Sequence, residues 1–326
     1  MKLNKIFILI YFIIIFYFVP SKIFAQITPE KDNPIFIQDL PKYDLKIAKK
    51  ITKPKDYINF INNLDKDNIY SISVAVKILD EQEFSTNGFD EIYFQFVDFY
   101  YTILSKTYEN IIAKVEGQLW EYPDSLIDID VKEVKEKRVK NFIKLLDENY
   151  CTLCSTEGGY FICEKNDALR NIFANKVSPS ISEFLKIREK EMHKQFFEDA
   201  TLVISFKELG ERIVTWEDFL NKYKEDKIKD EADRYHKIYL STFLIGFNNE
   251  PTIEYDYSES KPIGLESEVE KAYAYIIQTY PKTKVAALLK EYMALLKEKN
   301  YDISKLKDFF KSKDIIETRA IQWFHK

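Results

Sequence analysis

Apolar residues recur every three or four positions along most of this chain, which is the spacing of one face of an α-helix. The longest such stretch runs from Phe89 to Val115, and another runs from Val134 to Leu146. Four more stretches follow in the C-terminal half, beginning at Phe206, Ile228, Val269 and Val285. The pattern predicts an all-α fold class.

Polar residues three positions apart indicate where several of these helices begin. In a capping box, a Ser or Asp is followed three residues later by Glu, and each side chain bonds the other residue's backbone N–H. Gly246 and Asn300 follow two of the stretches and are typical residues for a helix end. The capping-box pattern occurs five times, at Asp130–Glu133, Ser180–Glu183, Ser205–Glu208, Ser267–Glu270 and Asp314–Glu317.

Two segments interrupt the helical pattern. Residues 151–163 contain Glu157-Gly158-Gly159-Tyr160, a turn signal that predicts one small β-hairpin near 153–163. Residues 248–264 are polar, acidic and aromatic and contain two prolines. We expect this second segment to be a long loop.

A weak internal repeat relates the two sides of that loop. Trp216-x-x-Phe219-Leu220-x-x-Tyr223 recurs 57 residues later as Tyr273-x-x-Ile276-Ile277-x-x-Tyr280, and a second helical stretch follows each copy. A single helix pair cannot bury its own apolar face, so repeated pairs stack on one another. The predicted architecture is therefore a set of stacked antiparallel helix pairs, similar to an α-solenoid.

The second copy ends in Tyr280-Pro281, and a short polar turn then leads to Val285-Ala286 at the start of the next helix. In this it resembles the tetratricopeptide-like helix pairs of bacterial envelope proteins, over about residues 206–300. Lys224 stands where the first copy would need the proline, and the Trp-Leu-Gly-Tyr pattern of a standard tetratricopeptide is absent. The resemblance implies a helical scaffold that binds other proteins.

The first 25 residues have the three parts of an export signal. Two lysines precede the uncharged apolar run Ile6–Val19, and Ala25 occupies the expected cleavage position. Fourteen apolar residues span only about 21 Å as a helix, less than a hydrocarbon core of about 30 Å. We therefore expect cleavage after Ala25 and a periplasmic or secreted protein. Retention of this segment as a membrane anchor is the alternative.

The expected domain organisation has four parts. Residues 1–25 form the signal peptide, 26–150 an N-terminal helical region, 151–166 a hairpin connector and 167–326 a C-terminal helical-repeat region. The full chain of 326 residues has a formal net charge of −5. Removal of the signal leaves 45 basic against 53 acidic residues, a net charge of −8. This acidic balance argues against nucleic acid and membrane partners.

The three cysteines lie close together in sequence, at 151, 154 and 163. Cys154 and Cys163 are the candidate disulfide, because a hairpin turn at Gly158-Gly159 would place them opposite each other, about 4.5 Å apart between Cα atoms. A Cys151–Cys154 redox pair and three free thiols are the alternatives. A zinc site would need further Cys or His ligands at suitable spacing, and no such residues are near.

Other chemical motifs are absent from the sequence. His193, His236 and His325 form neither a metalloprotease motif nor a triad. The acidic cluster Asp124, Asp128 and Asp130 lacks the glycine and distal glutamate of a calcium loop. We therefore assign no catalytic, cofactor-binding or metal-binding residues.

The aromatic residues are numerous, with 22 Tyr, 25 Phe and 3 Trp. Packing between helices explains most of them, including Trp216 and the crowded run from Phe94 to Tyr101. The preferred interpretation is an exported helical protein that binds another macromolecule, in a protein–protein interaction or as an envelope scaffold, through a groove or through the segment 248–264. The alternatives are a cell-envelope hydrolase with paired carboxylates and a binder of a small ligand in an aromatic pocket.

Overall fold

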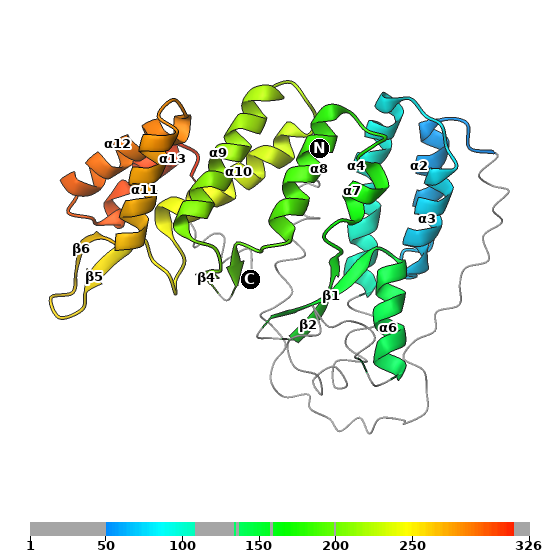
Figure 1. The fold of residues 1–326 in the computed structure, drawn as a ribbon, viewed down its shortest axis with the longest axis horizontal. Helices are drawn as coiled ribbons and strands as arrows, with labels where there is room; N and C mark the ends of the chain where they lie inside the picture. Colours follow the sequence, from blue (N-terminus) through cyan, green and yellow to red (C-terminus); the bar gives the residue numbers. More distant parts are fainter. Residues whose placement is uncertain (1–49, 108–133, 135–136, 157–158, 199, 316–326) are drawn as a thin grey trace. The chain divides into compact units, whose positions relative to one another are not determined.

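The computed structural model describes residues 50–107, 134, 137–156, 159–198 and 200–315 (Figure 1). The chain divides into two compact units, Met1–Glu189 and Lys190–Lys326. The described elements are mostly α-helices, together with three two-stranded antiparallel sheets. The mainly helical fold is confirmed, whereas only one of the three hairpins was expected.

Several predicted features lie outside the described residues. They are the export signal 1–25, the leader up to residue 49, the Asp130–Glu133 capping box, the acidic cluster 124–130, Glu317 and His325. Among the helices that the structure does describe, none is long and apolar enough to cross a membrane.

The first unit is built around helix α4 (Thr86–Thr107), which packs against α2 (Pro54–Asn62). Helices α3 (Tyr70–Asp80) and α6 (Lys137–Glu148) belong to the same unit. The aromatic run on α4 is buried, except for Phe94, which is half-buried. The prediction that these aromatic side chains form core is therefore confirmed.

The hairpin of the first unit consists of β1 (Cys151–Thr156) and β2 (Gly159–Glu164), followed by α7 (Ala168–Phe173) and α8 (Pro179–Met192). Strand β1 contacts α6, and β2 contacts α4, so the hairpin is a packed part of this unit. The boundary between the units falls within α8, later in the chain than the boundary predicted after residue 166.

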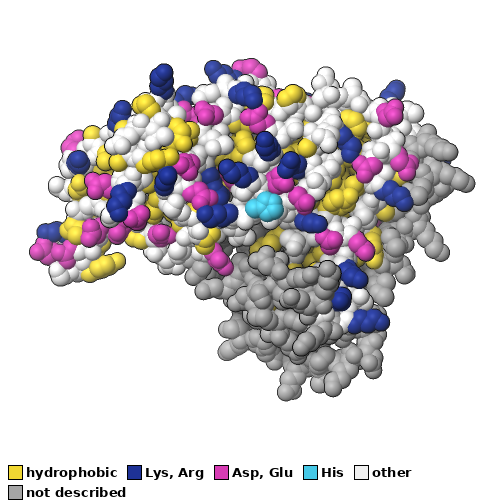
Figure 2. All heavy atoms as spheres, viewed as in Figure 1, with side chains coloured by type: hydrophobic (Ala, Val, Ile, Leu, Met, Phe, Trp, Pro, Cys, Tyr) yellow, Lys and Arg dark blue, Asp and Glu magenta, His cyan; other side chains and the backbone are white. Residues whose placement is uncertain are grey.

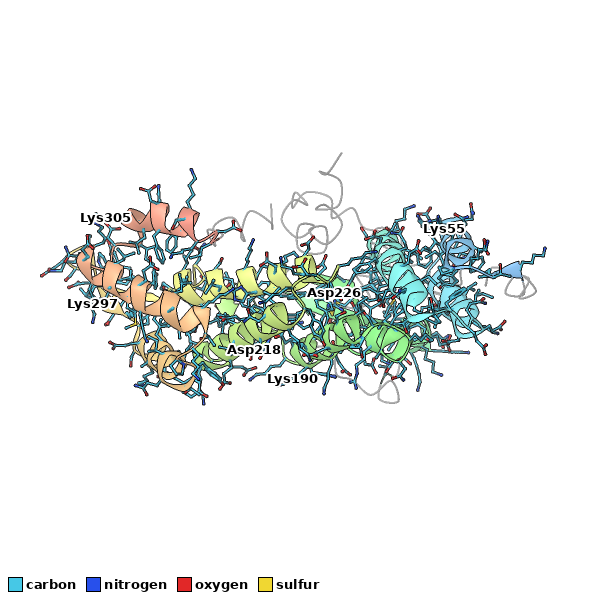
Figure 3. All side chains as sticks on the ribbon, turned by 90° about the horizontal axis from the view of Figure 1, so that it is seen from above. Lys55, Lys190, Asp218, Asp226, Lys297 and Lys305 are labelled. Carbon is cyan, nitrogen blue, oxygen red and sulfur yellow. A yellow bond between two sulfur atoms is a disulfide. The ribbon has the colours of Figure 1, made fainter. Side chains whose placement is uncertain are left out.

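The second unit contains α9 (Phe206–Lys222), α10 (Lys229–Ile245), α11 (Ser267–Thr279) and α12 (Lys284–Glu298). Helix α9 packs against α10 and α11, and α11 packs against α12. The turn of 3₁₀-helix η4 (Ile303–Leu306) leads into α13 (Lys307–Ser312). Figure 3 shows α12 between α11 and α13. A short hairpin of β3 (Phe197–Glu198) and β4 (Thr201–Leu202) precedes α9.

The predicted apolar face of α9 is the buried face of the helix. Leu209, Ile213 and Trp216 are completely buried, and Phe219 nearly so. Trp216 stacks on Tyr235 of α10, with ring centroids 5.1 Å apart and planes 10° from parallel. Trp216 is therefore a core residue, as predicted.

Two buried tyrosines bind the C-terminal end of α10. The hydroxyl of Tyr273 on α11 donates to the Phe243 carbonyl, and that of Tyr292 on α12 donates to the Leu244 carbonyl, each at 2.7 Å. The last carbonyls of a helix have no partner within the helix, so side chains from elsewhere must satisfy them. These hydrogen bonds link three helices at one point.

The predicted helix starts are correct at one position and displaced at two others. Ser205 accepts a hydrogen bond from Glu208 N at 3.1 Å and caps α9. Helix α8 begins earlier than predicted, at Pro179, because proline suits the first helical position. Ser267 is predicted to precede α11, but it is the first residue of the helix, and Glu266 is the residue before it. The backbone N–H of Glu266 donates to the Thr252 carbonyl at 3.0 Å and so belongs to the preceding hairpin. Gly246 and Asn300 adopt positive φ just after α10 and α12, as expected for helix ends.

The expected long loop at 248–264 is wrong. The segment holds a third hairpin, formed by β5 (Ile253–Asp256) and β6 (Lys261–Leu265). Apolar and polar residues alternate along the sequence of β5. However, the strand that pairs with it follows a polar turn, so the local pattern predicts a loop.

Candidate interaction surface

Exposed apolar side chains concentrate on the β5–β6 hairpin. Tyr257 is 84% exposed, and Tyr255 and Ile263 are also exposed. Val203, beside β4, completes the set of exposed large apolar side chains in the part of the chain that the structure describes. Figure 2 shows acidic and apolar side chains close together where Figure 1 draws β5 and β6.

The base of this hairpin is fixed to α10. Gly246, with φ of 77°, ends α10, and a Cβ there would come within 2.5 Å of the Glu250 carbonyl oxygen. Thr252 is fully buried, and its hydroxyl donates to the Leu244 carbonyl at 3.0 Å. Ile253 is buried as well. The hairpin therefore projects from a rigid base.

The turn at the tip is held by one carboxylate. Asp256 Oδ1 accepts hydrogen bonds from the Ser258 backbone at 2.8 Å, the Ser258 hydroxyl at 2.7 Å and the Glu259 backbone at 3.2 Å. These hydrogen bonds lower the pKa of the Asp256 carboxyl below its usual value, with the Ser258 hydroxyl contributing most. The local hydrogen bonds fix the turn that begins at Tyr257, directly after β5.

A bulge interrupts the pairing of β5 with β6. The register shifts between Glu254, which pairs with Gly264, and Tyr255, which pairs with Pro262. Ile263 is the extra residue between these pairs. Proline has no N–H for the ladder and is tolerated at such a position. Ile263 at the bulge and the two tyrosines are all exposed.

The hairpin is strongly acidic. Residues 250–266 include five acidic side chains and one lysine, a net charge of −4. That lysine, Lys261, forms an ion pair with Glu259. Glu254 and Glu259 are exposed. The surface thus combines apolar area with negative charge.

A disulfide joins Cys154 and Cys163, the pair favoured by the sequence, but the predicted register of the β1–β2 hairpin is wrong. Cys154 pairs with Phe161, Cys163 pairs with Thr152, and Gly159 pairs with Thr156. The two cysteines are diagonal neighbours, with Cα atoms 6.0 Å apart. A slip of two residues leaves every side chain on the same face, so alternation in the sequence fits both registers equally well.

Cys151 lies on the opposite face of that hairpin from the disulfide. Its thiol is buried and donates to the Asn149 carbonyl at 3.0 Å. Burial is the main cause that raises the pKa of the Cys151 thiol far above its usual value. An unreactive thiol on the far face does not suit a Cys151–Cys154 redox pair.

Strand β2 also carries a buried ion pair. Glu164 is 5% exposed, and both its oxygens accept from Arg188 of α8, at 2.7 and 2.8 Å. The Tyr101 hydroxyl donates to the same carboxylate and accepts from Arg188 at 2.6 Å. Every member of this group has partners inside the unit, so its role is structural.

Glu191 is a second buried carboxylate, in the second unit. It is 9% exposed and accepts from Trp216 Nε1 at 3.1 Å and from the Tyr239 hydroxyl at 2.8 Å. Burial raises the pKa of Glu191 to about 7, against the smaller opposing effects of the Tyr239 and Trp216 hydrogen bonds and of the nearby Arg212. The hydrolase alternative requires a carboxylate that reaches substrate, whereas this one is enclosed by core aromatics.

Two of the three histidines lie in the described part of the chain. His193 is exposed, whereas His236 on α10 is mostly buried, and burial lowers its pKa. Within the described residues, no three His, Cys, Asp or Glu side chains come together as a set of metal ligands.

The segment 248–264 is the predicted binding segment, but its exposed residues Tyr255, Tyr257 and Ile263 are not evident from the sequence pattern. The alternation of Ile253, Glu254, Tyr255 and Asp256 was the available signal. The burial of Glu191 is likewise not evident from the sequence pattern, because it depends on Trp216 of α9 and Tyr239 of α10.

Comparison with known proteins adds little. No family model and no solved structure matches the chain. One curated protein, the cysteine desulfurase SufS of Plasmodium falciparum, is 26% identical over 171 residues. The match covers 52% of this chain and 30% of that protein. The chain therefore spans less than a third of the length of this relative.

Proposed function

We propose that this chain is an exported helical protein that binds another protein through the tip of its β5–β6 hairpin. The observation that carries the proposal is the exposure of Tyr255, Tyr257 and Ile263 on one projecting hairpin. Tyrosine is enriched in protein interfaces because its ring buries apolar area while its hydroxyl keeps a polar partner. Apolar clusters that face water are typical of binding surfaces.

The helices behind the hairpin would serve as its scaffold. In this proposal α9 with α10 and α11 with α12 act as two stacked antiparallel pairs of the tetratricopeptide-like kind. The packing of α9 against both α10 and α11 supports this arrangement. The tyrosine hydrogen bonds to the end of α10 support a rigid joint between the pairs.

Export is supported by two independent features. One is the three-part N-terminal segment, and the other is the Cys154–Cys163 disulfide. Disulfides persist in oxidising compartments such as the periplasm and the extracellular space. A periplasmic or secreted location is therefore part of the proposal.

Cysteine desulfurase activity, which the name of this relative states, is not part of the proposal for this chain. A cysteine that accepts sulfur must be accessible as a thiolate. Here two cysteines form a disulfide, and the third is a buried thiol with a raised pKa. The short match to that protein gives no other support for the activity.

Photo-crosslinking in the source organism tests the proposal. Tyr257 is replaced by p-benzoylphenylalanine, and Lys297 on α12, another exposed position, is the matched control. We expect a discrete protein adduct from position 257 after irradiation, and its loss when Ile263→Ser and Tyr255→Ser are added. Equal adducts from both positions, or none from position 257, would show that the hairpin is not the binding surface.

A further inference from the structure

The tip of the β5–β6 hairpin offers aromatic faces and negative charge together. The rings of Tyr255 and Tyr257 lie 5.4 Å apart, and the two side chains are 42% and 84% exposed. Exposed glutamates flank them, Glu254 on β5 and Glu259 in the turn. A ligand at this position meets π-faces and carboxylates within a few residues of chain.

Only one positive charge within residues 250–266 offsets the negative charges of this hairpin. Lys261 is the single lysine of residues 250–266, and it is already paired with Glu259. Three hydrogen bonds within the turn hold Asp256 in its ionised form. The formal net charge of residues 250–266 is −4.

We infer that the partner presents a basic segment, in which arginine or lysine side chains alternate with apolar ones. This inference rests on the proposed function. A guanidinium or ammonium group is attracted both to the face of a tyrosine ring and to nearby carboxylates. The apolar side chains of such a segment would cover Ile263, whose exposed surface is otherwise in contact with water.

The same charges argue against other occupants. A second copy of this chain brings another hairpin of net charge −4 and, after removal of the signal, a total charge of −8, so like charges would meet. Anionic lipid surfaces and nucleic acids are repelled for the same reason. Charge complementarity thus selects a basic protein segment.

Fluorescence anisotropy with defined peptides tests this inference. The probe is a labelled (Arg-Leu-Gly)₃ peptide, and the matched control probe is (Glu-Leu-Gly)₃, which has the same apolar content. We expect the purified protein to bind only the arginine probe. We also expect binding to weaken about tenfold when NaCl is raised from about 50 to about 300 mM, because exposed charges are screened.

Two pairs of substitutions locate the binding. Glu254→Gln with Glu259→Gln removes two charges from the hairpin, and Asp218→Asn with Glu225→Gln removes two exposed charges elsewhere (Figure 3 labels Asp218). We expect the hairpin pair, and Tyr257→Ala separately, to weaken binding at least about tenfold, while the control pair changes it less than about twofold.

Three results would overturn the inference. The first is equal binding of both probes. The second is an equal loss of affinity for the arginine probe in the two double variants. The third is concentration-dependent self-association that Tyr257→Ala abolishes, because a second copy of the chain would then be the occupant. Crosslinks from position 257 together with failure of the arginine probe would refute the partner's chemistry and leave the proposed function intact. Absence of those crosslinks would refute the proposed function itself.

Discussion

Glu191 gives the second unit a pH-dependent stability that one isosteric substitution should remove. Its carboxyl group is enclosed by Trp216 and Tyr239 and is only 9% exposed. Burial raises its pKa from the usual 4.5 to about 7 in the folded chain. Between these two values the folded state holds a proton that the unfolded state releases.

The sign of the effect follows from proton linkage. A group that binds a proton more tightly in the folded state stabilises the fold at low pH, and that stabilisation is lost as pH rises. The loss begins near the unfolded pKa of 4.5 and is complete above the folded value of about 7. A pKa difference of this size corresponds to about 3 kcal/mol in the free energy of unfolding.

Glu191→Gln removes the ionisation and keeps the shape. The glutamine oxygen still accepts from Trp216 Nε1–H, and its NH₂ can donate to the Tyr239 hydroxyl, which accepts as well as donates. We expect the variant to be about 2–3 kcal/mol more stable than the unaltered chain at about pH 8 and nearly equal to it at about pH 5.

Urea unfolding followed by the fluorescence of Trp216 measures this difference. Trp120 and Trp323 are replaced by Phe, so that Trp216 is the single tryptophan and can be excited selectively in the presence of the tyrosines. The comparison is made between variants at each pH, because His236 has a pKa lowered by burial and adds an opposite pH dependence to both. Glu225→Gln, at an exposed position, is the control and should change stability by less than about 0.5 kcal/mol.

Two results would refute the reasoning. If the unaltered chain and Glu191→Gln lose stability in parallel between about pH 5 and pH 8, the carboxyl group of Glu191 does not titrate in this range. If the variant is stabilised equally at both pH values, its effect arises from packing or hydrogen bonding and not from the charge.

Three further predictions concern other parts of the chain. Trp216→Ala should cost about 3–5 kcal/mol in urea or thermal unfolding, because it removes a fully buried indole that stacks on Tyr235, and an unchanged melting temperature would contradict its place in the core. N-terminal sequencing of protein from the source organism should begin at Gln26, whereas intact Met1 in the membrane fraction would show an uncleaved anchor. Mass spectrometry of a non-reduced digest should find the Cys154–Cys163 peptide pair and no reaction of Cys151 with an alkylating agent before unfolding. A linked Cys151–Cys154 peptide would contradict the extended strand β1, in which these two side chains lie on opposite faces.

The sequence alone determined the approximate course of α4, α6 and α9 to α12, and the buried face of α9. Phe206, Leu209, Ile213 and Trp216 form the predicted face of α9, and all are buried. Gly246 ends α10, as its tolerance of positive φ suggested. These features depend on residues within one or two helical turns, so a local pattern is sufficient to predict them.

Tertiary structure decided the features that depend on distant residues. The start of α11 depends on a bond from Glu266 to Thr252, and the burial of Glu191 depends on Trp216 and Tyr239. The β1–β2 register could not be read from alternation, because a slip by two residues keeps the same faces. The exposed tyrosines became recognisable as a surface only once β5 had paired with β6, since pairing is a contact between segments that the linear pattern does not encode.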